Sequence, residues 1–173
     1  LAALLDREFP TVDEYHRALE RNSEALRRAN PSHASLYNTQ CDIVDHVERA
    51  APETVPEAKE ATEAAIEQVV ERVETGKRHA AAEARELLPD DGTILTHDYS
   101  TTVLSAIARA VEDGASFTVY VTEARPRHLG RKMARRLAEF EDVDTHLLVD
   151  SASGHYLPDC DRVLTGMSCI VGD

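Results

Sequence analysis

The sequence has 173 residues, of which 32 are Asp or Glu and 19 are Lys or Arg, so its formal net charge is -13. That length allows one large domain or two small ones. The excess of negative charge argues against binding to nucleic acid, whose phosphate backbone needs a basic patch. No apolar run approaches the roughly 20 residues of a membrane helix, and the start of the chain lacks a secretory signal. We therefore expect a cytoplasmic protein without a direct nucleic-acid or membrane partner.

The composition leaves two interpretations of the acidity open. Few Lys, no Trp and many acidic residues are typical of proteins from salt-loving organisms, but an ordinary acidic cytosolic protein has the same charge balance. The cysteines are odd in number and lack C-x-x-C spacing, which argues against a disulfide framework and a metal site. We expect free thiols, no metal and no cofactor. The chain begins without Met, which we interpret as a fragment or a trimmed chain.

A helical period dominates the N-terminal half. Thr11 is a predicted N-cap, and Glu14 completes a capping box with it. Helices are expected from there to the break at 30–32, from 35 to about 50, and from about 56 to 88. Gly76 predicts a kink or soft spot in the third helix. We therefore predict an N-terminal helical domain over residues 1–89.

The period changes after the turn residues Pro89-Asp90-Asp91-Gly92. Short β-rich runs then alternate with helical segments. The predicted strands are 94–95, 117–121, 145–149 and 163–164, and the predicted helices are 101–112 and 129–140. Such alternation indicates βαβ units and a parallel sheet. The predicted fold class is α/β: a helical domain followed by a Rossmann-like domain over residues 90–173, truncated after about four strands.

Polar residues follow the first predicted strand, where parallel sheets bind ligands. The loop from Thr96 to Ser100 offers hydroxyl groups, an imidazole and the Asp98 carboxylate just before a helix N-terminus, which suits a phosphate. In the alternative interpretation, Ser100 or Thr101 only caps that helix and His97 has a structural role. Asp98 opposes anion binding because two like charges repel.

The second loop contains an arginine that can hold an anion. Arg125 can form a forked pair with a phosphate or carboxylate, or it can pair with Glu123 to orient the loop. The basic residues from Arg127 to Arg136 either form a solvated helix face or meet an acidic partner. The later loops contain no dinucleotide or P-loop fingerprint, and Cys169 has no base beside it in sequence.

The loops together resemble one family. It groups the alpha, beta and delta subunits of eukaryotic translation initiation factor 2B with two sugar-phosphate isomerases, methylthioribose-1-phosphate isomerase and archaeal ribose-1,5-bisphosphate isomerase. Residues 30–36, Asn-Pro-Ser-His-Ala-Ser-Leu, are similar to the family motif Arg-Pro-Thr-Ala-Val-Ser/Asn-Leu. Residues 121–130 match Val-Thr-Glu-x-Arg-Pro-x-x-x-Gly, the most specific motif. Residues 94–100, 150–156 and 163–170 complete the series over nearly the whole chain.

This chain departs from the isomerase pattern at several positions that matter for chemistry. The catalytic Cys of the isomerases is replaced by Asp98, their catalytic Asp by Ser168, and their phosphate-binding Arg by Asn30. Isomerisation needs a positioned acid and base, so the resemblance implies that the usual machinery is lost. Tyr99-Ser100 is similar to the alpha subunit of factor 2B, whereas Arg125 is the isomerase-like residue.

The resemblance implies a regulatory protein similar to the factor 2B alpha subunit, without catalytic residues. It implies a homodimer that has a translation-factor partner and a sugar phosphate or nucleotide as ligand. The alternative is an isomerase similar to ribose-1,5-bisphosphate isomerase, with Asp98 as base and Arg125 on the substrate. The candidate ligand-binding residues are Asn30, Thr96, Asp98, Ser100, Arg125, Gly166 and Ser168.

Overall fold

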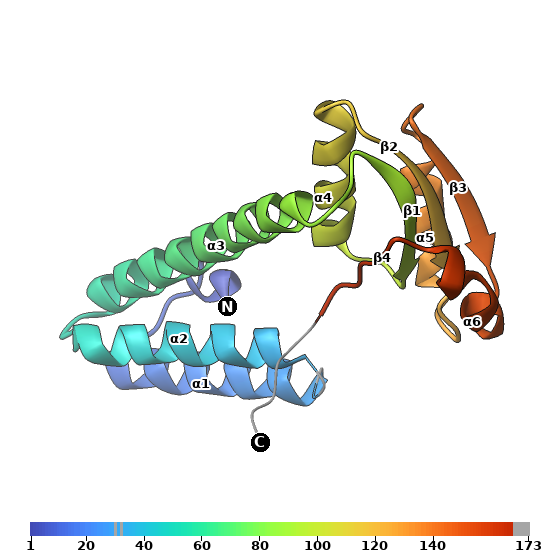
Figure 1. The fold of residues 1–173 in the computed structure, drawn as a ribbon. Helices are drawn as coiled ribbons and strands as arrows, with labels where there is room; N and C mark the ends of the chain where they lie inside the picture. Colours follow the sequence, from blue (N-terminus) through green and yellow to red (C-terminus); the bar gives the residue numbers. More distant parts are fainter. Residues whose placement is uncertain (30, 32, 168–173) are drawn as a thin grey trace, which may run out of the picture. The chain divides into compact units, whose positions relative to one another are not determined.

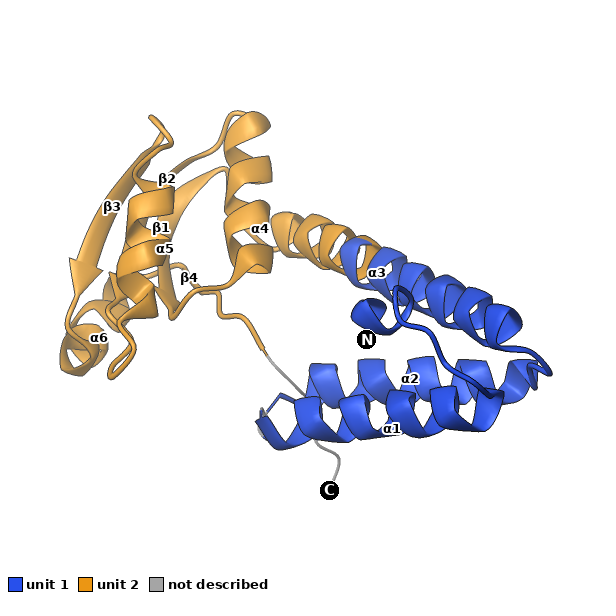
Figure 2. Ribbon diagram, turned by 180° about the vertical axis from the view of Figure 1, so that it is seen from behind, with its two compact units in different colours: residues 1–74, 168–173 blue, residues 75–167 orange. Residues whose placement is uncertain are grey.

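The computed structural model describes residues 1–29, 31 and 33–167, which form two compact units (Figures 1 and 2). Residues 1–74 form unit 1, residues 75–167 form unit 2, and the longest helix contributes to both. In chain order the elements are η1 (Ala2–Leu4), α1 (Val12–Ala29), α2 (Ala34–Ala50), α3 (Val55–Glu86), β1 (Asp91–His97), α4 (Thr101–Glu112), β2 (Ser116–Thr122), α5 (Leu129–Leu137), β3 (Val143–Leu148), η2 (Asp150–Ala152), α6 (Ser153–Tyr156), η3 (Leu157–Asp159) and β4 (Arg162–Val163). The domain boundary at residue 89 follows from the sequence period and stays a prediction.

Unit 1 is helical, as its period predicts. Thr11 Oγ1 accepts a hydrogen bond of 3.2 Å from the Glu14 backbone N–H, which confirms Thr11 as the N-cap of α1. Tyr15 is fully buried, and its hydroxyl donates to Thr62 Oγ1 at 2.8 Å, so a polar group enters this core with a partner. The buried apolar residues of the unit are Leu4, Tyr15, Ala18, Leu19, Ile43, Val47, Ala58, Ala65 and Val69.

Helix α3 is continuous through Gly76, so the predicted kink does not interrupt the helix. A Cβ atom at Gly76 would meet no heavy atom within 4 Å. No close contact therefore requires a glycine at this position, and Gly76 weakens the helix only through its backbone freedom.

Unit 2 contains the predicted parallel sheet with interleaved helices. The strand order is β3-β2-β1-β4, and every pairing is parallel. His97 at the end of β1 lies opposite Thr122 of β2, and Thr122 lies opposite Leu148 of β3. The register therefore brings the carboxyl ends of β1, β2 and β3 to one edge of the sheet.

The element boundaries differ from the prediction at turns. Strand β1 begins at Asp91, inside the predicted turn, and β3 begins at Val143, two residues before the predicted strand 145–149. Both segments pair with β2, whose register extends to Asp91 and Val143. Helix α5 ends at Leu137 rather than at residue 140, and the expected loop after β3 contains the short helices η2, α6 and η3.

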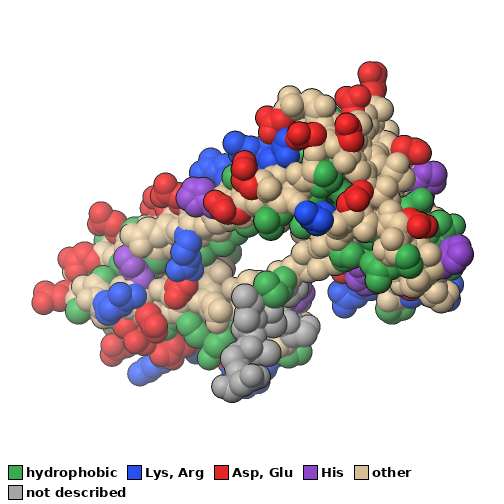
Figure 3. Space-filling view, in the orientation of Figure 1, with side chains coloured by type: hydrophobic (Ala, Val, Ile, Leu, Met, Phe, Trp, Pro, Cys, Tyr) green, Lys and Arg blue, Asp and Glu red, His purple; other side chains and the backbone are tan. Residues whose placement is uncertain are grey.

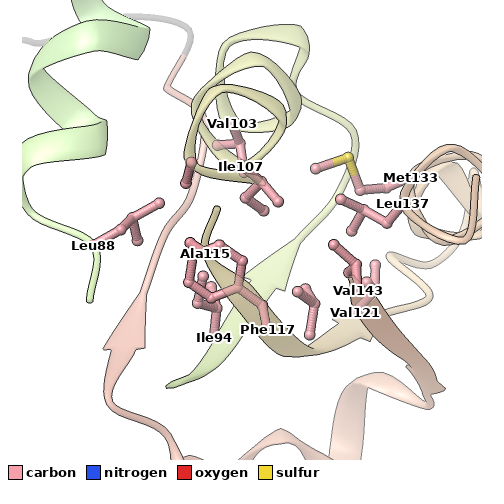
Figure 4. Close-up of a cluster of buried hydrophobic side chains, with 12 residues drawn as sticks. Leu88, Ile94, Val103, Ile107, Ala115, Phe117, Val121, Met133, Leu137 and Val143 are labelled. Atoms are coloured by element: carbon pink, nitrogen blue, oxygen red, sulfur yellow. The ribbon is translucent and has the colours of Figure 1, made fainter. Parts of the chain in front are cut away.

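The core of unit 2 lies between the sheet and the helices α4 and α5, which cover one face of it (Figures 1 and 4). Side chains of both helices, such as Ile107 and Met133, point toward the strands. Each fully buried side chain of this size contributes about 1.5–3 kcal/mol. The buried cluster consists of Leu88, Ile94, Val103, Ile107, Ala110, Ala115, Phe117, Val119, Val121, Met133, Leu137 and Val143.

Gly130 allows the N-terminal end of α5 to approach the end of β2. A Cβ atom at this position would lie 1.8 Å from the backbone oxygen of Thr122, which is closer than any real contact. The Gly130 backbone N–H donates to the backbone oxygen of Glu123 at 3.2 Å. The loop between β2 and α5 therefore depends on a residue without a side chain.

We expect opposite effects from alanine at two glycines. Gly130→Ala should lower the free energy of unfolding by about 1–3 kcal/mol because the backbone of β2 must move, whereas Gly76→Ala should raise it by up to about 1 kcal/mol because Ala favours the helix. Urea denaturation measures both changes. Gly154→Ala is the control for the Gly130 contact: it also adds a Cβ to a helical glycine, but one that meets nothing within 4 Å, so it should not lower the free energy of unfolding. A Gly130→Ala protein as stable as the parent would contradict the close approach.

Candidate functional site

The candidate site lies at the carboxyl edge of the unit 2 sheet, at the point where the strands that follow β1 are added on opposite sides of it. From β1 the chain continues through α4 to β2 on one side, whereas β4 pairs with β1 on its other side. Such a switch point separates the loops that follow neighbouring strands, and open α/β sheets bind ligands there. The predicted ligand residues of unit 2 lie on β1 and on the loops after β1, β2 and β4.

The loops after β1 and β4 are in close contact. Ser100 is the N-cap of α4, and its hydroxyl accepts a hydrogen bond of 3.3 Å from the Val103 backbone N–H. A Cβ atom at Gly166 would lie 2.5 Å from both Cβ and Oγ of Ser100. Two predicted ligand residues therefore meet at the N-terminal end of α4, and a larger residue at 166 would displace the cap.

The polar residues at the end of β1 differ in accessibility. Thr96 is only 1% exposed, so its hydroxyl lies inside the unit and its role in ligand binding stays a prediction. His97 Nδ1 lies 2.6 Å from Thr122 Oγ1, which links the ends of β1 and β2. Asp98 is exposed with a φ of 67°, and its carboxylate makes no hydrogen bond or ion pair within the described part of the chain. An incoming ligand therefore meets the Asp98 charge.

A buried carboxylate organises the loop after β2. Glu123 is 5% exposed, and its two carboxylate oxygens accept from Arg125 Nε and Arg131 Nη2, each at 2.9 Å. His128 Nδ1 lies 3.2 Å from the same carboxylate. The hydrogen bond from Arg131 holds the pKa of Glu123 below its ordinary value, with support from Arg125 and against the effect of burial.

Arg125 has its side chain held at one end and free at the other. Its Nε is occupied by Glu123, yet 70% of its side chain is exposed. The terminal Nη groups of an arginine can bind two oxygens of a phosphate or carboxylate. The pairing with Glu123, which the sequence left as an alternative to anion binding, is therefore present and leaves that edge of the guanidinium available.

The side chain of Asp150, which follows β3, holds the same loop by accepting hydrogen bonds from the loop's backbone N–H groups. Its Oδ1 accepts from the Ala124 backbone N–H and its Oδ2 from that of Arg125, both at 2.8 Å. These bonds, the one to Arg125 first, hold the pKa of Asp150 below its ordinary value. The sequence shows an acidic residue after this strand, but its partners could not be predicted, because they are backbone groups of the loop after β2.

The basic residues of α5 and the loop before it are divided among several contacts. Lys132 Nζ lies 4.2 Å from the centre of the Tyr99 ring, a cation–π contact that connects α5 with the loop after β1. Arg131 pairs with Glu123 and Arg136 with Glu139. Acidic side chains are spread over the face seen in Figure 3, with smaller groups of Lys and Arg between them.

Several expectations concern residues or groups beyond this edge. Asn30, Ser168 and Cys169 lie outside the described residues. Cys41 and Cys160 are free thiols of intermediate exposure. Over the residues that the structure describes, no cluster of three or more His, Cys, Asp or Glu side chains could hold a metal. None of the described helices is both long and apolar enough to cross a membrane.

Sequence comparisons relate the whole chain to one family. The model of the initiation factor 2 subunit family matches residues 1–173. A ribose 1,5-bisphosphate isomerase from Haloterrigena turkmenica is 32% identical over 97% of this chain and 50% of its own length. A putative translation initiation factor eIF-2B subunit 2-like protein from Pyrococcus horikoshii is 30% identical over 87% of this chain and 50% of its own length. The chain spans about half the length of these curated relatives.

Solved structures show the same fold. The translation initiation factor eIF-2B of Pyrococcus horikoshii OT3 superposes with a TM-score of 0.82 at 27% identity, over 98% of this chain and 57% of that one. The tetrameric eIF2B-beta2-delta2 complex of C. thermophilum gives a TM-score of 0.74 at 18% identity, over 97% of this chain and 57% of that one. The second likeness shows the fold alone; the complex in that structure is a tetramer.

The Glu123 cluster predicts a pH dependence of stability. The folded pKa of Glu123 is lowered, so its contribution is fully present above the ordinary Glu pKa of about 4.3 and is lost as the pH falls through the lowered value. Glu123→Gln should therefore destabilise the chain at about pH 7, and the difference from the parent should shrink as the pH falls through the lowered pKa of Glu123. Urea midpoints of both proteins over this range measure the effect.

The matched control for that experiment is Glu139→Gln, which removes an exposed carboxylate paired with Arg136. An exposed pair of this kind contributes about 0–1 kcal/mol, so the control should change stability little at any pH. A constant difference between the parent and Glu123→Gln from neutral to acid pH would contradict the role of the ionised carboxylate.

Proposed function

The chain belongs to the initiation factor 2 subunit family, and from that premise we propose that it binds a phosphorylated small molecule without converting it. In this proposal the protein is a regulatory factor similar to the alpha subunit of initiation factor 2B, it forms a homodimer, and a translation-factor protein is its partner. The ligand is a sugar phosphate or a nucleotide, bound at the carboxyl edge of the unit 2 sheet. The mass of the purified chain in solution, compared with 19.1 kDa for one copy, decides the oligomer.

The exposed guanidinium of Arg125 is the observation that carries the proposal. Glu123 holds its Nε and Asp150 holds its backbone N–H, while 70% of the side chain remains open. A fixed arginine loses less freedom when it binds an anion, so a larger part of the interaction energy appears as affinity. The α4 N-terminus, capped by Ser100, follows the neighbouring strand of the same edge and also favours negative charge.

Asp98 supports the non-catalytic part of the proposal. It occupies the position of a catalytic cysteine in the isomerases that this sequence resembles, so the thiol that takes part in their catalysis is absent. Its exposed charge also raises the cost of an anion nearby. Ser168 stands where those isomerases have a catalytic Asp, so the resemblance leaves no acid–base pair with the usual residues.

A second candidate function is sugar-phosphate isomerisation. The 32% identity to a ribose 1,5-bisphosphate isomerase favours it, and Arg125 matches the isomerase pattern. In this mechanism Asp98 takes the proton from C2 of the sugar and returns it to C1, while the bond between C1 and the ring oxygen breaks. The C2 hydroxyl gives its proton to the ring oxygen as C2 becomes a ketone, and Arg125 holds a phosphate group. General base catalysis of this kind needs the carboxylate within hydrogen-bond reach of the proton.

Binding measurements test the anion site. Arg125→Gln should weaken the binding of ribose 1,5-bisphosphate roughly 10- to 100-fold, since a charge-assisted hydrogen bond contributes about 1.5–3 kcal/mol. Asp98→Asn should strengthen it by about fivefold, because removal of a like charge near an anion gains about 1 kcal/mol in water. Calorimetric titration measures both constants.

Arg135→Gln is the matched control for those titrations. Arg135 is exposed on α5 and forms no ion pair in the described chain, so the variant loses the same charge away from the edge. Equal affinities of the parent and Arg125→Gln would reject Arg125 as the anion-binding residue. Weakening by Arg135→Gln to the same degree would instead indicate nonspecific attraction by net charge.

Turnover measurements separate the two candidate functions. We expect no conversion of ribose 1,5-bisphosphate at an enzyme-like rate, for which typical kcat values are about 1–1000 per second. Conversion at such a rate would overturn the non-catalytic proposal. If Asp98→Ala then abolished it, with binding retained, the second candidate would be established with Asp98 as the base; retained activity would exclude that role.

A further inference from the structure

We propose that Asp150 is a positioning residue for Arg125 and acts on it through the backbone. The inference rests on the proposed function, because Arg125 is the residue assigned there to the anion. Asp150 does not contact the guanidinium through any hydrogen bond or ion pair in the described part of the chain. Its effect on a ligand would therefore pass through the conformation of residues 124–125.

The Asp150 carboxylate accepts hydrogen bonds from two consecutive backbone N–H groups. Oδ1 accepts from Ala124 N–H and Oδ2 from Arg125 N–H, each at 2.8 Å. Hydrogen bonds to an ionised carboxylate are stronger than neutral ones, and two of them restrain both position and rotation. Asp150 is itself fixed, because it follows β3 and its backbone oxygen accepts from Ser153 Oγ at 2.9 Å.

These two hydrogen bonds stabilise a backbone conformation that alanine seldom adopts. Ala124 has a φ of 58°, in the left-handed region where a Cβ atom is unfavourable. A non-glycine residue remains there only when its surroundings impose it. Besides the Asp150 contact, the Ala124 oxygen accepts from His128 N–H at 2.8 Å, which closes the loop on its other side. Without Asp150 the peptide between Ala124 and Arg125 loses its restraint on the donor side.

Glu123 and Asp150 thus restrain different parts of one arginine. Glu123 binds Nε, and Asp150 binds the backbone N–H, so the Nη groups remain for the ligand. An anion is then met by the end of the guanidinium, because the side that includes Nε is occupied. This arrangement predicts that a change at Asp150 weakens anion binding only while an arginine is present at position 125.

A double-mutant cycle on the whole chain tests the inference. The proteins are the parent, Arg125→Gln, Asp150→Asn and the double variant, titrated with ribose 1,5-bisphosphate and with inorganic phosphate. Asp150→Asn places an amide donor against a backbone donor and should weaken binding at least fivefold. In the Arg125→Gln background it should change the affinity by less than twofold, because interacting sites are not additive.

Controls separate positioning from general loss of structure. Asp144→Asn removes the same charge from β3, where Asp144 pairs with His146 at 2.9 Å, and should leave the affinity within twofold of the parent. Asp150→Glu keeps the charge but displaces the carboxylate, and should weaken binding as Asp150→Asn does. Amide hydrogen exchange without ligand should show lost protection at Ala124 and Arg125 in both Asp150 variants.

The outcomes distinguish this inference from the proposed function. Parent-like affinity of Asp150→Asn, or equal weakening with and without Arg125, would reject Asp150 as a positioning residue. Unchanged amide hydrogen exchange at Ala124 and Arg125 in the Asp150 variants would show that Asp150 does not restrain this loop. If Arg125→Gln alone leaves the affinity unchanged, the proposed anion site fails, whereas lost protection in the Asp150 variants still shows that Asp150 holds the loop.

Discussion

In unit 2, β1 and β2 run parallel with Asp91 opposite Ser116 and His97 opposite Thr122. Because the side chains of a strand alternate between faces, a shift of one residue would exchange the buried and exposed sets. The same register delivers the loops after both strands to one edge. Arg125 and Asp98 follow the paired ends of β2 and β1, so their placement depends on this pairing and on the core beneath it.

Among the described residues of this edge, Glu123 is the buried charged side chain, and two arginines pair with it. The Glu123 carboxylate is nearly buried and is surrounded by Arg125, Arg131 and His128. A buried charge without partners would cost more than this loop could offset. These pairs therefore stabilise the conformation of the loop, as apolar packing stabilises the sheet.

The sequence predicted element types better than contacts. The helix from Thr101 to Glu112 and the order of strands and helices followed from the period, because buried positions repeat locally. The Ser100 cap followed from residue type. The bonds from Asp150 to Ala124 and Arg125 did not, since they join segments 25 and 26 residues apart through backbone groups that every residue carries. The Gly166 contact with Ser100 needed the β1–β4 pairing, which a two-residue strand scarcely signals.

The burial of Glu123 has a further consequence when ionic strength rises. At 1 M salt, interactions between exposed charges fall off over about 3 Å, whereas buried pairs are screened much less. Glu24, which pairs with Arg27 and Arg28 on the surface of α1, has 35% of its side chain exposed, against 7% for Glu123. At nearly molar salt, the Glu24 pairs on α1 would therefore weaken more than the pairs of Glu123.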